Sequence, residues 1–209
     1  MKTTVMKLIL ISILLSISTI GFSADVGEKS LEQTHDDWLS YLLTFTNGDV
    51  LLRTHTTNKN GAMFTIDEIP NDNGTCTEDI SVITDKTSGI TQDTTDDGFG
   101  NIQVFGYNVH KTIFKMNTAG SVNQAFFHIT RIEDMKTFIQ EAGSGALVTI
   151  NFVLPDKGAA TESFSLMGFV SAMDRANTTC EKFGKIIQDK KSVPEQTVPA
   201  PAGSPYIKI

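Results

Sequence analysis

Two cysteines carry the most sharply defined chemistry in this chain of 209 residues. Cys76 and Cys180 are an even pair, and in an oxidising compartment such a pair most simply forms one disulfide. That bond would close a loop of about a hundred residues and stabilise the fold by roughly 4–5 kcal/mol through chain entropy. The alternative, a nucleophilic thiol, needs a neighbouring base and an exposed thiolate. Because Cys180 ends an apolar helical stripe, we predict a structural disulfide.

The four histidines, His35, His55, His110 and His128, lack the spacing of a metal site. No pair is four residues apart, as on a zinc-binding helix, and none adjoins a cysteine. The sequence Gly143-Ser144-Gly145 lacks the outer spacing of a nucleophile elbow. We therefore predict no catalytic residue, no metal and no cofactor. The alternative is a dispersed hydrolase site in which His110 or His128 meets a distant carboxylate.

Asp93, Asp96 and Asp97 precede Gly98, and this acidic cluster invites comparison with a calcium-binding loop. In an EF-hand register that starts at Asp93, position twelve is Val104, where a bidentate glutamate is required. The EF-hand is thereby excluded. A looser calcium site in the same loop stays open as an alternative.

The segments that would position these residues have mainly the pattern of β-strands. Trp38 opens an apolar run that ends at Asn47-Gly48, and this dipeptide favours a tight hairpin because both residues tolerate positive φ. Further strands are expected at 49–57, 62–66, 80–83, 102–107, 109–116, 122–130, 146–154 and 162–166. The pattern predicts a mainly β fold, an antiparallel β-sandwich or a partly open barrel.

Two segments have the 3.6-residue apolar period of helices instead. The first is 131–142, with Gly143 as its stop signal, and the second starts near Gly168 and runs past Cys180. We expect two short helices that close an open end or cover one face of the β structure.

The N-terminus has the pattern of a secretory signal peptide at 1–23. A lysine-bearing start precedes an apolar run over 8–20, and Gly21 and Ser23 are small residues before a cleavage ahead of Ala24. The apolar run is too short for a transmembrane anchor. We therefore predict that the mature protein is secreted or periplasmic.

Beyond the signal peptide, the composition divides the chain into three parts. Residues 24–37 are a polar lead-in, expected to be mobile or a short surface helix. A single β-rich domain is expected at 38–191, and a Pro-rich flexible tail at 192–209.

The net charge bounds the choice of partners. The formal charge is −7, and loss of the signal peptide would remove two lysines and no acidic residue. An acidic chain without a basic block is repelled by nucleic acid and by anionic lipid. We therefore expect a protein or cell-surface partner, no nucleic acid and no stable membrane insertion.

The stretch Phe164–Met173 (FSLMGFVSAM), followed by Cys180, resembles the closing segment of invasion-associated locus B type proteins. In these small secreted bacterial proteins, a strand leads through a Leu-x-Gly-Phe turn into a short helix that bears a cysteine. Trp38, at the start of a first strand, adds to the resemblance. The chain departs from that family in its polar lead-in, its Asp/Thr-rich middle loop and its Pro-rich tail.

The resemblance implies an exported bacterial protein linked to host interaction, and it brings no catalytic residue with it. Our leading hypothesis is a non-enzymatic envelope or secreted binding protein, and the alternative is the secreted hydrolase with a dispersed active site. A pocket that holds a histidine and a carboxylate in contact would favour the hydrolase. A flat face with exposed aromatic side chains would favour the binding protein.

Overall fold

The computed structural model describes residues 26–84, 97–118, 125–154 and 158–192 of the chain. The predicted signal peptide, Asp93 and Asp96 of the acidic loop, and residues 193–209 of the predicted tail lie outside these ranges. The described residues form ten strands and two helices, in the order β1 (Val26–His35), β2 (Trp38–Phe45), β3 (Val50–Thr57), β4 (Met63–Pro70), β5 (Cys76–Thr84), β6 (Asp97–Val104), β7 (Val109–Thr118), β8 (Ala125–Ile132), α1 (Met135–Ser144), β9 (Leu147–Leu154), β10 (Gly158–Ser165) and α2 (Phe169–Ser192).

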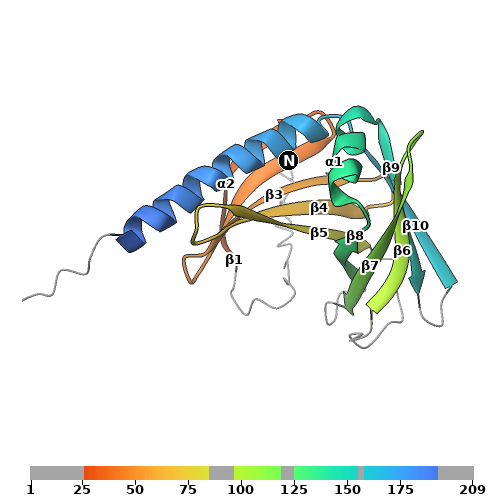
Figure 1. Cartoon of the computed structure of the whole chain (residues 1–209), viewed down its shortest axis with the longest axis horizontal. Coiled ribbons are helices and arrows are strands. Elements are labelled where there is room, and N and C mark those ends of the chain that lie inside the picture. Colours follow the sequence, from red (N-terminus) through yellow and green to blue (C-terminus); the bar gives the residue numbers. More distant parts are fainter. Residues whose placement is uncertain (1–25, 85–96, 119–124, 155–157, 193–209) are drawn as a thin grey trace, which may run out of the picture.

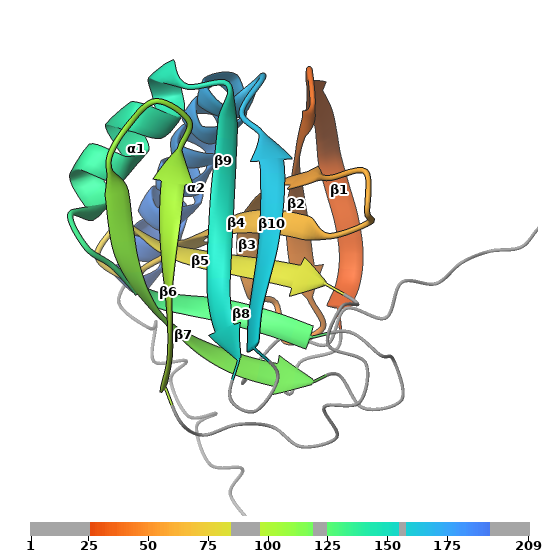
Figure 2. The same cartoon turned by 90° about the vertical axis from the view of Figure 1, so that its right-hand side faces the viewer.

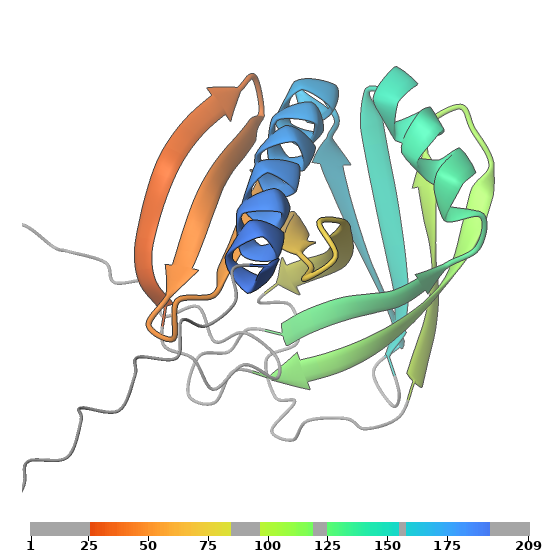
Figure 3. The same ribbon diagram turned by 60° about the vertical axis from the view of Figure 1, so that its left-hand side comes forward.

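All ten strands belong to one antiparallel sheet, in the order β1-β2-β3-β4-β5-β8-β7-β6-β9-β10. The sheet is open and strongly curled. Figure 3 shows β1 and β2 on one side and β6, β9 and β10 on the other, with β7 and β8 passing between them. The predicted mainly β class is confirmed. Of the two predicted arrangements, the curled single sheet corresponds to the partly open barrel.

The two helices lie on the same side of the curled sheet, as Figure 1 shows. Helix α2 packs against β2, β3, β4 and β5, and α1 packs against β6, β8 and α2. In Figure 2, α2 lies at the back and is seen between β6 and β9, so the walls of the sheet and the helices enclose the main core. Neither of these two helices combines the length and the apolarity that crossing a lipid bilayer requires.

The curl is fixed by contacts between strands that are not neighbours in the sheet. Trp38 of β2 is fully buried, and its indole Nε1 donates a hydrogen bond to the backbone oxygen of Ser165, at the end of β10, over 2.9 Å. Its ring packs edge-on against Phe64, with the ring centroids 5.9 Å apart, and against Phe169, at 5.1 Å. One tryptophan therefore joins the second strand of the sheet to the last strand and to the start of α2.

The predicted lead-in at 24–37 is wrong where the structure describes it, because Val26–His35 is strand β1 and pairs with β2. Most of its described side chains are exposed, so the edge strand lacks the apolar alternation by which buried strands are found. Its register shifts between Ser30 and Gln33, and Leu31 lies between them at φ +52°. Such a bulge, together with charged side chains, protects an edge strand from pairing with other chains.

Helix α1 differs from its predicted bounds, whereas α2 begins next to Gly168 and runs past Cys180 as predicted. Helix α1 begins at Met135 rather than at 131, because Ile132 still belongs to β8 and Asp134 caps the helix by accepting hydrogen bonds from the backbone nitrogen and the hydroxyl of Thr137. Helix α2 has 24 residues, so the prediction of two short helices is wrong for this one.

Gly168, at the turn into α2, offers a direct test of this junction. Its φ is +88°, and a Cβ added there would lie 1.8 Å from the backbone oxygen of His35. Gly61 has a similar φ of +82° but open space around it. We expect Gly61→Ala to cost about 1–2 kcal/mol, from the left-handed backbone alone. Gly168→Ala should cost more than about 4 kcal/mol, because backbone must also move. Urea unfolding of both variants measures this, and equal losses would contradict the described junction.

Candidate functional site

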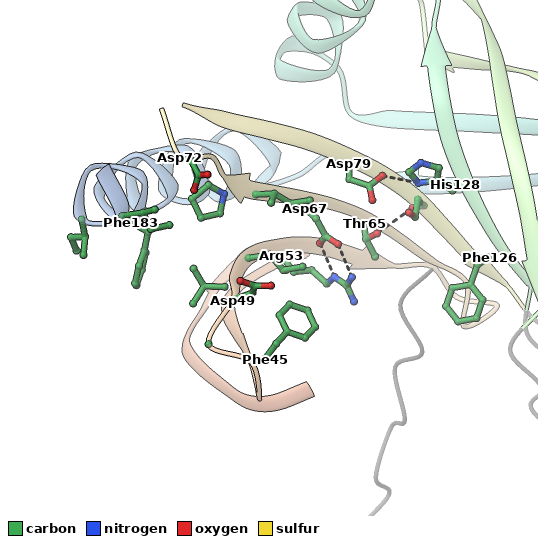
Figure 4. Close-up of a pocket in the computed structure, with 18 of the residues that line it drawn as sticks. Phe45, Asp49, Arg53, Thr65, Asp67, Asp72, Asp79, Phe126, His128 and Phe183 are labelled. Atoms are coloured by element: carbon green, nitrogen blue, oxygen red, sulfur yellow. Dashed lines mark hydrogen bonds and ion pairs between the residues drawn. The ribbon is translucent and has the colours of Figure 1, made fainter. Parts of the chain in front are cut away.

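The candidate site is a cavity of about 570 Å³ on the face of β2–β5 opposite α2, extending to the end of that helix. We call it the groove. Its polar lining comprises Asp49, Arg53, Thr65, Asp67, Asp72, Asp79, Ser81 and His128. Its apolar lining comprises Phe45, Val50, Leu51, Ile69, Pro70, Ile83, Phe126, Phe183, Ile186 and Ile187. Figure 4 shows Phe183 at one end of the groove and Phe126 and His128 at the other.

Strand alternation explains why these residues share one face. Side chains two residues apart in a strand point to the same side of the sheet. In β4, Phe64 and Ile66 enter the main core, while Thr65 and Asp67 line the groove. The cross-strand register then places the polar side chains of β3, β4, β5 and β8 side by side.

At the centre of the groove, Arg53 and Asp67 form a bidentate ion pair. They face one another across β3 and β4, and the guanidinium Nε and Nη2 donate to the two carboxylate oxygens over 2.7 and 2.6 Å. Both side chains are at least nine-tenths buried. Burial raises the pKa of Asp67, whereas the pKa of Arg53 is held above its usual value because the adjacent Asp67 outweighs the effect of burial.

The same geometry leaves part of the arginine unsatisfied. A contact through Nε and Nη2 puts Nη1 on the opposite edge of the planar guanidinium from Asp67. This Nη1 is buried and has no hydrogen-bond partner by geometry in the part of the chain that the structure describes, although the Tyr41 hydroxyl, on the neighbouring strand, is close enough to help raise the pKa of Arg53. A buried donor of this kind is rare in folded proteins and is commonly satisfied by water or by a ligand.

A second ion pair lies at the β8 end of the groove. His128 Nδ1 is 2.7 Å from Asp79 Oδ1, and both side chains are half-buried. The hydrogen bond to Asp79 raises the pKa of His128, against the opposing effect of burial. His128 therefore keeps its positive charge to a higher pH than a free histidine does. The groove thus holds two cationic side chains, each paired with an aspartate (Figure 4).

The predicted disulfide is present, since Cys76 and Cys180 are bonded with their Cα atoms 6.3 Å apart. It joins the start of β5 to the middle of α2 and lies outside the groove. Of the acidic loop, only Asp97 and Gly98 fall within the described ranges, as the first residues of β6. The calcium alternative therefore stays untested.

The histidines are placed on four different strands, β1, β3, β7 and β8, and only His128 lines the groove. His110 is buried, and its ring nitrogens contact the backbone oxygen of Glu133 at 2.9 Å and Glu141 Oε2 at 2.8 Å. These contacts tie β7 to helix α1, which carries Glu141. His110 therefore has a structural place, away from any open cavity that the structure describes.

His55 lies beside the central ion pair, on the same face of β3 as Arg53. Its ring meets Tyr41 edge-on, with the centroids 5.6 Å apart. Burial, aided by the neighbouring Arg53 charge, lowers the pKa of His55 to about 4. His55 is therefore neutral at physiological pH and adds no charge to the groove.

Sequence patterns did not single out Arg53, Asp67 or Asp79 as site residues. Arg53 stands among apolar and threonine residues, and Asp67 and Asp79 are each next to a glutamate in an otherwise apolar strand. A charged residue within a buried strand is the signal that could have drawn attention to them. Their partners lie on other strands, so the pairs emerge only from the register.

Comparison with known proteins yields little about the site. No protein-family model matches the chain, and no curated protein matches it either. The crystal structure of invasion associated protein B from Bartonella henselae is similar to this chain, at 13% identity over 72% of this chain and 98% of that chain, with a TM-score of 0.37. That protein belongs to the group that the C-terminal segment resembles, so the predicted resemblance is confirmed as a structural match. At this TM-score the match transfers no residue role to the groove.

The buried ion pair predicts an asymmetric response to substitution. Arg53→Met should destabilise the protein by about 3–5 kcal/mol, because it leaves Asp67 buried without a partner. Replacing both residues, as Arg53→Met with Asp67→Leu, should recover most of that loss or exceed wild-type stability. Urea unfolding of the single and double variants measures the coupling. A double variant as unstable as the sum of the two singles would contradict the pairing.

The His128–Asp79 pair predicts a pH dependence. The His128 pKa measured by NMR titration should lie above 6.5, and Asp79→Asn should lower it, whereas Asp49→Asn should leave it nearly unchanged. Because the folded-state pKa is raised, the pair stabilises the fold fully below pH 6.5, and its contribution is lost as the pH rises through the folded pKa. A wild-type pKa at or below 6.5 would show that the contact with Asp79 does not persist in solution.

Proposed function

We propose that the protein is an exported, non-enzymatic binding protein of a bacterial envelope or secretome, and that the groove takes an extended segment of a partner protein. The observation that carries the proposal is Arg53, a buried cation at the centre of a cavity with apolar walls, whose Nη1 has no hydrogen-bond acceptor among the described residues. A ligand carbonyl or carboxylate oxygen placed there would satisfy this donor. An ion pair with a structural role alone gives no reason for a buried donor without a partner.

Two features support export. The Cys76–Cys180 disulfide belongs to oxidising compartments such as the periplasm or the cell exterior. The N-terminal sequence has the charged start, apolar run and small residues of a signal peptide. Both features support an encounter with the partner outside the cytoplasm.

The lining of the groove favours a polypeptide over a fatty acid or a phosphate. Four aspartates and two cations line it, so its excess of negative charge disfavours an anionic ligand. A peptide backbone offers both donors for the carboxylates and acceptors for Arg53, and its side chains can reach the apolar walls. A hydrocarbon chain would offer no acceptor to Arg53 Nη1 and no donor to the aspartates.

Exposed apolar side chains provide a second surface on which a partner could dock. Phe99 of β6 and Val153 of β9 are cross-strand neighbours, and they are 65% and 57% exposed. Phe105, in the turn between β6 and β7, is 79% exposed. Phe99 and Val153 are an exposed apolar pair of the kind that can contact a partner. Phe105 lies at the other end of β6, and polar side chains, Asn101 and Asn151 among them, stand between.

The groove can be tested with a matched pair of helix-surface variants. Ile186 and Val170 both lie on α2 and are 48% and 47% exposed, but only Ile186 lines the groove. Peptides selected from a random phage-displayed library on the wild-type protein should bind Ile186→Asp at least about tenfold more weakly and Val170→Asp with unchanged affinity. Failure to select any peptide, or equal binding to both variants, would contradict the proposal.

A hydrolase is the second candidate, favoured by the contact between His128 and Asp79 in the same cavity. Ser81 is the cross-strand partner of His128, but no hydrogen bond joins the two side chains among the described residues. Turnover of p-nitrophenyl esters that disappears in His128→Gln would favour this candidate over the binding protein.

A further inference from the structure

Glu68 is a buried acid that neither the groove nor the main core explains. It lies on β4 in the row of Phe64 and Ile66, on the face opposite to the groove, and is 1% exposed. Its carboxyl Oε1 has no hydrogen-bond partner in the described part of the chain. One carboxyl oxygen of Glu68 and the sulfur atoms of Cys76 and Cys180 all lie within 4.8 Å of one another. The acid therefore stands directly beside the disulfide.

The two cysteines differ in their exposure. Cys76 is half-buried and lines a polar cavity of about 520 Å³, together with Glu68 and Glu78. Cys180 is completely buried. Cys76 is therefore the more accessible of the two to a thiol that enters from solvent, and attack there makes Cys180 the leaving group, released inside the protein.

The charges around Glu68 favour its protonated form. Glu78 of β5 is its cross-strand partner, and Asp67 precedes it on β4. Glu181 and Lys185 of α2 line the same cavity. Burial, followed by the charges of Glu78 and Asp67, raises the pKa of Glu68 to about 7. Near neutral pH the residue can therefore either give or take a proton.

A metal site is the obvious rival use of these three residues. Metal binding by cysteine requires thiolates, whereas these two sulfur atoms are bonded to each other. With the disulfide formed, Glu68 is left as one carboxylate without a second anionic ligand in contact. The three atoms are arranged for chemistry on the sulfur–sulfur bond itself.

We propose that Glu68 is the proton donor and acceptor for thiol–disulfide exchange at Cys76–Cys180. The co-reactant is an external thiol, either a small dithiol or a cysteine of a partner protein. Its thiolate attacks Cys76 Sγ and forms a mixed disulfide, while the bond to Cys180 Sγ breaks. The electron pair leaves on Cys180 Sγ, which takes the proton of the neutral Glu68 carboxyl. In the reverse direction the Glu68 carboxylate accepts the Cys180 proton as that sulfur attacks the mixed disulfide.

The exchange has a structural consequence, because the disulfide holds the middle of α2 to the start of β5. The following turns of α2 carry Phe183 and Ile186, which line the groove. Reduction would remove the covalent restraint between this part of the helix and the sheet. The state of the disulfide would thus bear on the shape of the groove.

The test is the rate at which dithiothreitol reduces the full-length folded protein between pH 5 and 9, divided at each pH by the concentration of its thiolate. We expect the wild-type rate to fall at least about tenfold as the pH rises through 7. Glu68→Gln should show no such inflection and should be slow at every pH, because an amide cannot supply the proton. Glu78→Gln, the matched control, should keep the inflection and shift it to lower pH.

Two outcomes would overturn the proposal. If Glu68 only repelled the incoming thiolate, Glu68→Gln would be as fast at pH 8 as the wild-type protein is at pH 6. If Glu68 had a packing role alone, the wild-type rate would show no inflection near pH 7. The reverse reaction gives an independent readout, since closure of the disulfide from a glutathione adduct at pH 8 should be slower in Glu68→Gln. Circular dichroism of each variant checks that it is folded.

Discussion

Trp38 lies where three parts of the chain meet: the start of β2, the end of β10 and the first turn of α2. Its indole donates to Ser165 over 2.9 Å, and its ring is enclosed by Phe64 and Phe169. The curl of the sheet depends on this junction, because an open ten-stranded sheet has no ladder between its two ends. The junction also sets the starting point and direction of α2. The position of Cys180 over β5, and of Ile186 at the groove, both follow from that direction.

The sheet carries charged side chains at buried positions on both of its faces, and it accommodates them in two ways. Arg53 and Asp67 neutralise one another in a bidentate pair. Glu68, the next residue of β4 but on the opposite face, has no ion pair with a cation among the described residues, and burial raises its pKa to about 7. Buried charges are costly, and apolar residues in their places would often be as stable or more stable. Stability alone therefore gives no reason for Arg53, Asp67 and Glu68 at these buried positions.

Sequence reasoning succeeded where the pattern is local. Asn47-Gly48 located the hairpin between β2 and β3, and the apolar stripe that ends at Cys180 indicated a cysteine facing inward to pair with Cys76. Strand β1 was missed because it is a polar edge strand, whose backbone pairing leaves no apolar pattern. The groove was missed for a different reason. Arg53, Asp67, Asp79 and His128 come together only through the register of four strands and through the pairing of β5 with β8. No spacing along the chain encodes that arrangement.

The central claim is that the partner enters the groove, and amide hydrogen exchange tests it most directly. Exchange would be followed for the full-length protein alone and saturated with a peptide selected on it. Binding in the groove predicts added protection in β3, β4, β5, β8 and the last turns of α2, with β6 and β9 unchanged. Protection confined to β6 and β9, around Phe99 and Val153, would contradict the claim and assign partner binding to the exposed apolar face.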